Sequence, residues 1–555
     1  MGGTRGHRRP HDRRRLRRLH RQPGATRRSR RLHGRGRAAI FRLHRTHRIV
    51  PQGRQCRWCT GDNAVIEPAL GALLDYGQAQ GLIADRDRVY VRNRILEVLR
   101  IDDYDLAAEV STDSAAQVDE LLAPLLDDAA ARGLITPDTV TQRDLWDTAI
   151  MGCFVPPPSV VAQTFWAGYQ NDPVRATDVF HHEAVASNYI RVGRTDRNIS
   201  WQQATDYGVM DMTINVSKPE KDPRDIAAAA GSSAAGYPQC LLCPQNEGYR
   251  GRADHPARQN LRLIGLELAD EPWFLQYSPY RYYNEHCIVL SDEHRPMRIE
   301  DATFVRLAEF TRILPHYLIG SNADLPIVGG SILSHDHFQG GRYEFAMDRA
   351  GSDWSTMIGA VEVHVLHWPL AVLRLQGPDD KVLALSNRIL GAWREYADPE
   401  RGVFAFSGDT PHNTITPIAR RQADALRMDL VLRNNRTSGE HPDGIFHPHA
   451  EIHPVKRENI GLIEVMGLAV LPGRLEGELE TIARTLVSGG ELPEDCAAHA
   501  PMLAELRQGE PVTDLAEARA RARHMAGTYF VRGLEHCGVF GADRVAGSQR
   551  FLAAV

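Results

Sequence analysis

A short glycine-rich segment that carries two histidines constrains this chain more than any other feature. Residues 326–341 read Pro-Ile-Val-Gly-Gly-Ser-Ile-Leu-Ser-His-Asp-His-Phe-Gln-Gly-Gly. His335, His337 and Gln339 stand at strict two-residue spacing just after the first glycines. Because a strand points alternate side chains to one face, we expect both imidazoles and the amide to face the same way.

This pattern favours phosphate chemistry. Gly329 and Gly330 lack a Cβ, so the backbone at these positions can approach a ligand closely. Ser331 and the backbone N–H groups around the two glycines can donate hydrogen bonds to phosphate. One histidine could then attack phosphorus while its neighbours hold the oxygens. The alternatives are a metal site, or a pair of buried histidines with a structural role.

A Cys-x-x-Cys motif indicates a second site. Cys240 and Cys243 have the spacing by which one loop supplies two thiolates to zinc, and any further ligands must come from distant sequence. The alternative is two buried thiols without a metal. The chain has only 8 cysteines in 555 residues, which fits a reducing compartment and predicts a cytoplasmic protein.

From about residue 64 the apolar periodicity predicts a helical lobe followed by strands. The proline run at 156–158 interrupts the lobe, and after residue 206 the period shifts towards two. Helices are expected at 64–80, 89–100, 115–132, 143–151, 180–206, 301–318, 382–396 and 476–488, and strands at 209–216, 284–290, 325–332, 361–366, 425–433, 449–455 and 460–471.

Several segments together resemble the hexose-1-phosphate uridylyltransferases, in the branch often called class II, which belong to the histidine-triad-like superfamily. They are the glycine-rich segment 326–341 and residues 255–260, 277–291 and 294–297. In class I the central motif reads His-Pro-His-x-Gln, and Asp336 in place of the proline is similar to the class II pattern.

The resemblance implies an α+β fold, with a helical N-terminal lobe followed by two histidine-triad-like halves built on mainly antiparallel sheet. The expected divisions are a disordered Arg-rich tail at 1–61, a helical lobe at 62–232, a first half with zinc and nucleophile at 233–400, and a second half at 401–555. The implied reaction moves UMP between UDP-glucose and galactose-1-phosphate in galactose metabolism. Family members are often dimers, so a homodimer is expected.

By the same resemblance, His337 is the nucleophile. Its neutral imidazole would attack the α-phosphorus of UDP-hexose, and the uridylyl-histidine would pass UMP to a second hexose-1-phosphate. Gln339 stands where related hydrolases carry a third histidine. An amide cannot act as an acid, but it can hydrogen-bond a phosphoryl oxygen, and a sugar phosphate is already a good leaving group. Gln339 therefore favours a transferase over the alternative, a dinucleotide hydrolase or phosphorylase.

The resemblance also assigns the metal ligands and other contacts. Cys240, Cys243, His294 and His335 would form a structural Cys2His2 zinc site. In the polar cluster at 434–453, His449 and Glu451 fall where some relatives bind a second metal, but those relatives carry histidine in place of Glu451, which argues against a second metal here. Arg281 is a candidate phosphate contact, and His286 is interpreted as a core or supporting residue. Residues chemically suited to bind a sugar phosphate are Asn434, Asn435 and Arg436.

The first 50 residues hold 18 arginines, no lysine and one acidic residue. Such a segment cannot bury a core, and we interpret residues 1–61 as translated from too early a start, in preference to a transit peptide or a basic arm. Because the net charge is −4, the remainder is strongly acidic. This argues against a zinc-stabilised nucleic-acid-binding protein, the alternative from a different class. No apolar run of about 18 residues is present, so no membrane span is expected.

Overall fold

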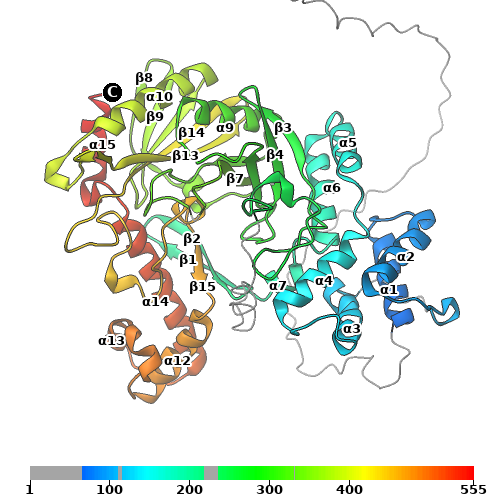
Figure 1. Ribbon diagram of the computed structural model, residues 1–555. Coiled ribbons are helices and arrows are strands. Elements are labelled where there is room, and N and C mark those ends of the chain that lie inside the picture. Colours follow the sequence, from blue (N-terminus) through cyan, green and yellow to red (C-terminus); the bar gives the residue numbers. More distant parts are fainter. Residues whose placement is uncertain (1–65, 110–115, 218–235, 331) are drawn as a thin grey trace, which may run out of the picture. The chain divides into compact units, whose positions relative to one another are not determined.

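The computed structural model describes residues 66–109, 116–217, 236–330 and 332–555, all within the compact unit Thr60–Val555. The Arg-rich segment 1–61 and Ser331 lie outside the described residues. The fold is α+β, as the sequence predicted, with helices first and then a large antiparallel sheet (Figure 1). Among the described helices, none is long and apolar enough to cross a membrane.

The N-terminal region is helical. Its elements are α1 (Ile66–Ala79), α2 (Arg88–Leu99), α3 (Val118–Ala131), α4 (Val140–Gly152), α5 (Pro158–Tyr169), α6 (Pro173–Ala186) and α7 (Val192–Thr195). Leu73 of α1, Ile95 of α2 and Leu125 of α3 are fully buried in a core of their own. At the start of α4, the Thr139 hydroxyl accepts a hydrogen bond from the backbone N–H of Gln142, which caps the helix.

A ten-stranded sheet is the largest element of the described residues. In spatial order its strands are β3 (Ile264–Leu268), β4 (Glu271–Tyr277), β5 (Cys287–Ser291), β7 (His337–Gly341), β6 (Leu318–Gly320), β13 (Asn413–Gln422), β14 (Ala425–Asn434), β10 (Val372–Gly377), β9 (Val361–Leu366) and β8 (Ser352–Ile358). A separate two-stranded ribbon consists of β11 (Phe406–Ser407) and β12 (Thr410–Pro411).

The order of the large sheet contains an internal repeat. Each unit has three successive strands, a helix, and two more strands, of which the last lies beside the third. The first unit is β3 to β7 with α9 (Asp301–Ile313), and the second is β8 to β14 with α10 (Asp379–Glu395). The two units meet where β6 pairs with β13.

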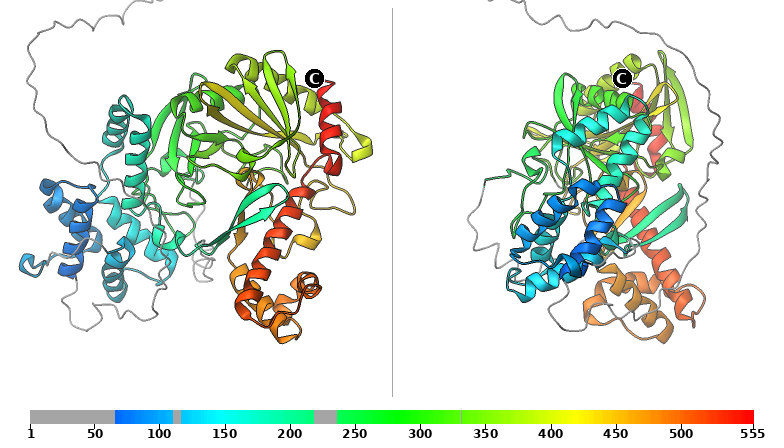
Figure 2. Two further views of the ribbon diagram at one scale, coloured as in Figure 1. Left: turned by 180° about the vertical axis from the view of Figure 1, so that it is seen from behind. Right: turned by 90° about the vertical axis from the view of Figure 1, so that its right-hand side faces the viewer.

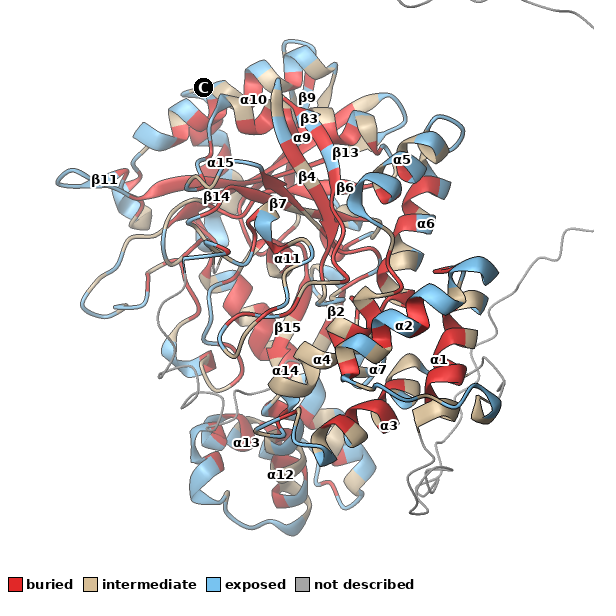
Figure 3. Cartoon of the chain, turned by 45° about the vertical axis from the view of Figure 1, so that its right-hand side comes forward, coloured by how far each residue is buried: buried red, intermediate tan, exposed pale blue. Residues whose placement is uncertain are grey.

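Helices α9 and α10 pack on one face of the large sheet. The alternation of side chains along β7 determines which face carries His337. Phe304 of α9 and Trp393 of α10 share a buried core with Phe338 of β7. Because successive strand residues point to opposite faces, His337 and Gln339 lie on the face away from this core. Figure 3 shows the strands of the large sheet as mostly buried.

A small sheet and the C-terminal helices form a second core. The sheet consists of β1 (Ile199–Thr205), β2 (Gly208–Asn215) and β15 (Leu468–Pro472), with β15 parallel to β2. The helices are α11 (Leu462–Val465), α12 (Leu475–Ser488), α13 (Ala500–Arg507), α14 (Leu515–His536) and α15 (Arg544–Leu552). The β1–β2 hairpin lies beside α14 (Figures 1 and 2). This core includes Val372 and Val431, which lie on the same face of the large sheet as His337.

The structure corrects several expected elements. Residues 325–330, expected to lie in a strand, form turns, and β7 begins only at His337, so His335 precedes the strand. Proline and paired glycines favour a turn over a strand ladder. Residues 449–455 carry a short 3-10 helix, Ala450–Ile452, instead of a strand. Residues 460–471 divide into α11 and β15, and β15 joins the small sheet.

The packing of β7 predicts the effect of one methyl group. A Cβ added at Gly340 would lie 2.4 Å from the carbonyl oxygen of Leu318 on the adjacent strand β6. Because backbone cannot move aside cheaply, Gly340→Ala is expected to lower the free energy of unfolding by about 1–3 kcal/mol, measured by urea denaturation. Gly351→Ala is the matched control, since nothing lies within 4 Å of its added Cβ. Equal stability of the two variants would contradict this account.

Candidate active site and metal centre

Four side chains from distant parts of the sequence meet next to the start of β7. Cys240 and Cys243 come from the loop before β3, His294 from the segment after β5, and His335 from just before β7. Their candidate ligand atoms all lie within 4.8 Å of one another. Cys240 Sγ is 3.2 Å from His335 Nδ1, and Cys243 Sγ is 3.2 Å from His294 Nδ1. The arrangement is a possible metal site with the four ligands expected from the sequence.

The donor set fits a metal ion that prefers sulfur and nitrogen. With bonds of about 2.0–2.3 Å, a tetrahedral ion holds its ligand atoms about 3.3–3.8 Å apart, and the two sulfur atoms here are 3.4 Å apart. His335 Nε2–H donates to the carbonyl of Ser291 at 2.8 Å, which leaves Nδ1 as the ligand atom. Burial raises the pKa of the Cys240 thiol, but the hydrogen bonds with His335, the Leu242 backbone and Cys243 together outweigh this, so the pKa falls below the usual value. A lower pKa favours the thiolate, which is the form that binds metals.

Hydrogen bonds hold the cysteine loop in shape. The amide of Asn246 donates to the carbonyls of Cys240 and Cys243, both at 2.8 Å. The Asn246 side-chain oxygen lies 2.7 Å from His255 Nε2, and both residues are buried. The loop therefore presents its two thiols in a fixed geometry.

His337 has the protonation pattern of a nucleophile. It opens β7 and is only 6 % exposed. Its Nδ1–H donates to the backbone carbonyl of His335 at 2.8 Å, so Nε2 carries the lone pair. Burial lowers the pKa of His337 to about 4, which keeps the ring neutral near pH 7. A neutral imidazole with an available Nε2 lone pair can attack phosphorus.

Gln339 follows on the same strand and contacts a histidine from the neighbouring strand. Its Oε1 lies 3.2 Å from Nε2 of His286, which immediately precedes β5 and is 3 % exposed. The sequence interpretation of His286 as a core or supporting residue did not include this contact, because the register of β5 against β7 sets it.

The glycine-rich loop, residues 325–330, is held by close packing and by a residue between β14 and α11. A Cβ on Gly329 would lie 2.5 Å from the carbonyl oxygen of Ala323, and one on Gly330 would lie 2.7 Å from Asn322 Nδ2. The amide of Asn459 donates to the carbonyl of Gly329 at 3.3 Å. Asn459 was not a sequence candidate, and only its contact across the fold indicates a role.

The residues expected to recognise a sugar phosphate have different surroundings. Asn435 donates to the carbonyl of Pro326 at 3.3 Å, within the glycine-rich loop. Asn434 is fully buried and bonded to Phe404 and Asn413 within the fold. Arg436 donates to the carbonyl of Gly402, and Arg281 pairs with Asp196 at the surface. The substrate roles of these four residues stay predictions.

A second cluster of candidate metal ligands contains His449, Glu451 and His536. The ring of His449 stacks between those of His441 and His536, with centroids 4.0 and 4.1 Å away. His536 Nε2 lies 3.4 Å from a carboxylate oxygen of Glu451. No local sequence pattern indicates His536, which lies at the end of α14, so only the tertiary structure adds it to this cluster.

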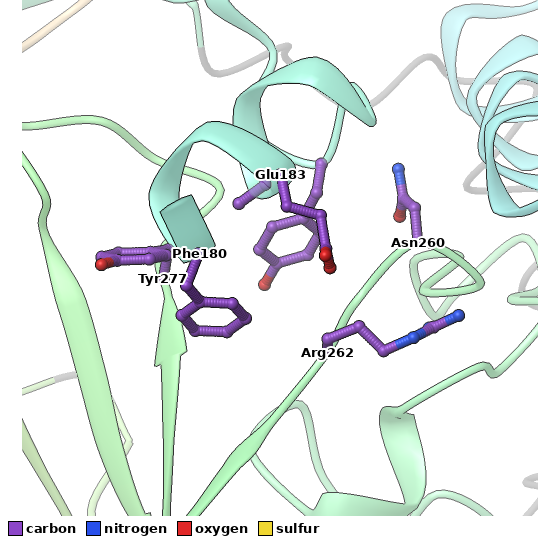
Figure 4. Close-up of a pocket in the computed structure, with 7 residues that line it drawn as sticks. Phe180, Glu183, Asn260, Arg262 and Tyr277 are labelled. Carbon is purple, nitrogen blue, oxygen red and sulfur yellow. The ribbon is translucent and has the colours of Figure 1, made fainter. Parts of the chain in front are cut away.

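A small pocket elsewhere on the chain lies between α6 and the start of the large sheet (Figure 4). Phe180, Glu183, Asn260, Arg262 and Tyr277 line it. Its volume of about 10 Å³ is that of roughly one water molecule, too small for a nucleotide. It contains none of the residues of the metal cluster or of β7.

The metal cluster predicts a loss of bound metal on substitution. Cys240→Ser removes one thiolate, so the purified variant is expected to hold less than about half the metal of the parent, measured by elemental analysis. Cys153→Ser is the matched control, because Cys153 is also a half-buried free cysteine but lies outside the cluster. The same metal content in both variants would contradict the ligand assignment.

Comparisons with known proteins give a consistent family. Residues 81–296 match the family model described as galactose-1-phosphate uridyl transferase, N-terminal domain, and residues 310–500 match its C-terminal domain. The galactose-1-phosphate uridylyltransferase of Halalkalibacterium halodurans is 47 % identical over 496 residues, which cover 87 % of this chain and 97 % of the relative. That of Bacillus subtilis is 48 % identical over 495 residues, covering 87 % and 96 %. That of Clostridium acetobutylicum is 50 % identical over 429 residues, covering 76 % and 85 %.

Among solved structures, yeast Ap4A phosphorylase is similar with a TM-score of 0.32 and 12 % identity, over 56 % of this chain and 94 % of that chain. A similarity with this TM-score and identity does not indicate a function. The two family models and the curated relatives, in contrast, extend over most of the chain. This chain belongs to the galactose-1-phosphate uridylyltransferase family.

Proposed function

We propose that this chain moves UMP from UDP-glucose to galactose-1-phosphate through a uridylyl-histidine at His337. Membership of the family supports the overall reaction, since the curated relatives are named galactose-1-phosphate uridylyltransferases. The observation that carries the mechanism is the hydrogen bond from His337 Nδ1 to the carbonyl of His335, because it leaves Nε2 with the lone pair.

The reaction consists of two displacements at one phosphorus. In the first, Nε2 of His337 bonds to the α-phosphorus of UDP-glucose, the bond from that phosphorus to the bridging oxygen breaks, and glucose-1-phosphate leaves with the electron pair. In the second, a phosphate oxygen of galactose-1-phosphate attacks the same phosphorus. The phosphorus–nitrogen bond breaks, UDP-galactose forms, and the imidazole returns to its neutral state.

Gln339 is the proposed contact to the phosphoryl oxygens. An amide N–H stabilises the negative charge that builds on these oxygens in both steps, without transferring a proton. Neither leaving group needs protonation, because each displacement expels a stable anion or a neutral imidazole. This makes an amide suitable at position 339.

We infer that the metal of the Cys240 cluster is zinc in a structural role. Two cysteines and two histidines are a common closed tetrahedral set for zinc, with no position left open for substrate. His335 is both a candidate ligand and the residue whose carbonyl holds His337, so the metal would fix the backbone from which the nucleophile projects. His337 is not one of the four clustered residues, and its Nδ1–H is used on the carbonyl of His335.

We also infer that the two histidine-triad-like halves correspond to the repeated units of the large sheet. The order of strands supports a division between β7 and β8, upstream of residue 400. β8 pairs with β9, β9 with β10 and β10 with β14, and none of these three strands pairs with the first unit. The helical lobe and the C-terminal helices are then additions to a ten-stranded centre. The expected homodimer stays a prediction.

The overall reaction is tested by product identification. Incubation of the protein with UDP-glucose and galactose-1-phosphate is expected to give equal amounts of UDP-galactose and glucose-1-phosphate, measured by chromatography with mass detection. Release of UMP without transfer would instead indicate a hydrolase, and failure to consume either substrate would contradict the proposal.

The nucleophile is tested separately. His337→Ala is expected to lose the UMP adduct that forms with UDP-glucose alone, measured by intact-protein mass after acid-free quenching, and to turn over at least about 10³-fold more slowly. His316→Ala is the control, because His316 bonds to Thr177 in the helical region and not to β7. An adduct that persists at full level in His337→Ala would remove His337 as the nucleophile.

A further inference from the structure

His286 is a buried histidine whose ring touches the active-site strand but takes no part in the transfer steps described above. Nδ1 of its ring lies 2.9 Å from the carbonyl oxygen of Tyr280. Nε2 lies 3.2 Å from Oε1 of Gln339. Both ring nitrogens are therefore used within the protein, one on the backbone and one on the amide that we place next to the reacting phosphate.

The carbonyl oxygen of Tyr280 and the side-chain amide of Gln339 determine which ring nitrogens of His286 carry a hydrogen. The carbonyl of Tyr280 can only accept, so Nδ1 of His286 must carry a hydrogen. If the ring is neutral, Nε2 accepts, and Gln339 must turn its NH2 group towards His286. If the ring is protonated, Nε2 donates to Gln339 Oε1, and the NH2 group points to the other side. In both states His286 engages one end of the amide and leaves the other end for a ligand.

From this geometry we propose that His286 is a positioning residue for uridylyl transfer, which determines the end of the Gln339 amide that faces the phosphate. The inference rests on the proposed function, in which Gln339 donates to a phosphoryl oxygen. Such donation needs Oε1 to face His286, and hence a hydrogen on Nε2. Burial lowers the pKa of His286 in the free protein. The negative charge of a bound nucleotide would raise this pKa and so favour a hydrogen on Nε2.

The surroundings of His286 fix its ring before any ligand binds. The ring of Tyr283 lies against it with centroids 4.7 Å apart, and that of Tyr282 at 5.4 Å. The hydroxyl of Tyr283 donates to the carbonyl of Gly340, the residue after Gln339, at 2.9 Å. The supporting residues thus connect to the same strand that carries the amide, which is how a site holds a catalytic group in one orientation.

Without His286 the amide could present its oxygen to the phosphate. Two oxygen atoms with partial negative charge repel, whereas an N–H donor stabilises the charge of the transition state. Both displacements occur at the same phosphorus, so loss of orientation affects both half-reactions. Binding of the sugar phosphate depends on other contacts, so KM is expected to change less than kcat.

Two substitutions separate the contact to Gln339 from the contact to Tyr280. In His286→Gln the side-chain amide reaches about as far as Nε2 and can both donate and accept, so it can still engage Gln339. In His286→Asn the shorter amide reaches only to the position of Nδ1, which retains the contact to Tyr280 alone. We expect His286→Asn to lower kcat about tenfold or more, and His286→Gln to retain at least about a third of kcat, with KM changing less than about threefold in either.

A double-mutant cycle tests whether His286 acts through Gln339. In the Gln339→Ala background, His286→Asn is expected to lower kcat no more than about twofold further. Each kcat is divided by the fraction of protein that forms the UMP adduct, so a partly misfolded sample cannot imitate a loss. Independent, multiplicative losses in the cycle would overturn the positioning role, as would equal kcat values of His286→Asn and His286→Gln.

The same variants distinguish failure of this inference from failure of the proposed function. If Gln339→Ala has a normal kcat, the proposed role of the amide is wrong and the positioning role falls with it. If Gln339→Ala is slow but the cycle is multiplicative, only the positioning role is wrong. Absence of the UMP adduct in the unsubstituted protein would overturn the uridylyl-histidine itself.

Discussion

One hydrogen bond connects the chemistry of this protein to its architecture. The Nδ1–H of His337 donates to the carbonyl of His335, and the imidazole of His335 belongs to the cluster with Cys240 and Cys243. The bond sets the tautomer of His337, the proposed nucleophile, because a nitrogen that donates to a carbonyl cannot also hold the lone pair. A metal in the cluster would therefore stabilise the orientation of a side chain that it does not touch.

The two repeated units of the large sheet carry different side chains on their corresponding faces. In the first unit, the face away from α9 carries His337 and Gln339. In the second unit, the corresponding face of β14 carries Asp429, which is 1 % exposed and binds Arg374 of β10 through Arg374 Nε at 2.7 Å. A paired, buried guanidinium and carboxylate satisfy each other and leave no reactive group. Residues that follow β14 instead support the first unit, since Asn435 and Asn459 hold the glycine-rich loop.

Local patterns predicted much of the fold. Apolar spacing located α1, α2, α3 and α10, because a helix that buries one side needs that period. It failed at residues 180–206, which were expected to form one helix but divide into α6, α7 and β1. It also failed in short segments with too few residues to show a period: residues 325–330 are turns, and Leu462–Val465 is a helix. The order of the ten strands was not predictable, because strand pairs such as β6 with β13 join segments about a hundred residues apart.

For the site, the sequence by itself determined the residue types and the spacing that chemistry requires: His337 and Gln339 two apart, and two thiols from one loop. The tertiary structure decided which distant groups meet them. His294 approaches His335, and His286 approaches Gln339, because β5 lies beside β7 in a particular register. Spacing along the chain reports local geometry, whereas contacts between strands depend on how the whole sheet buries its apolar face.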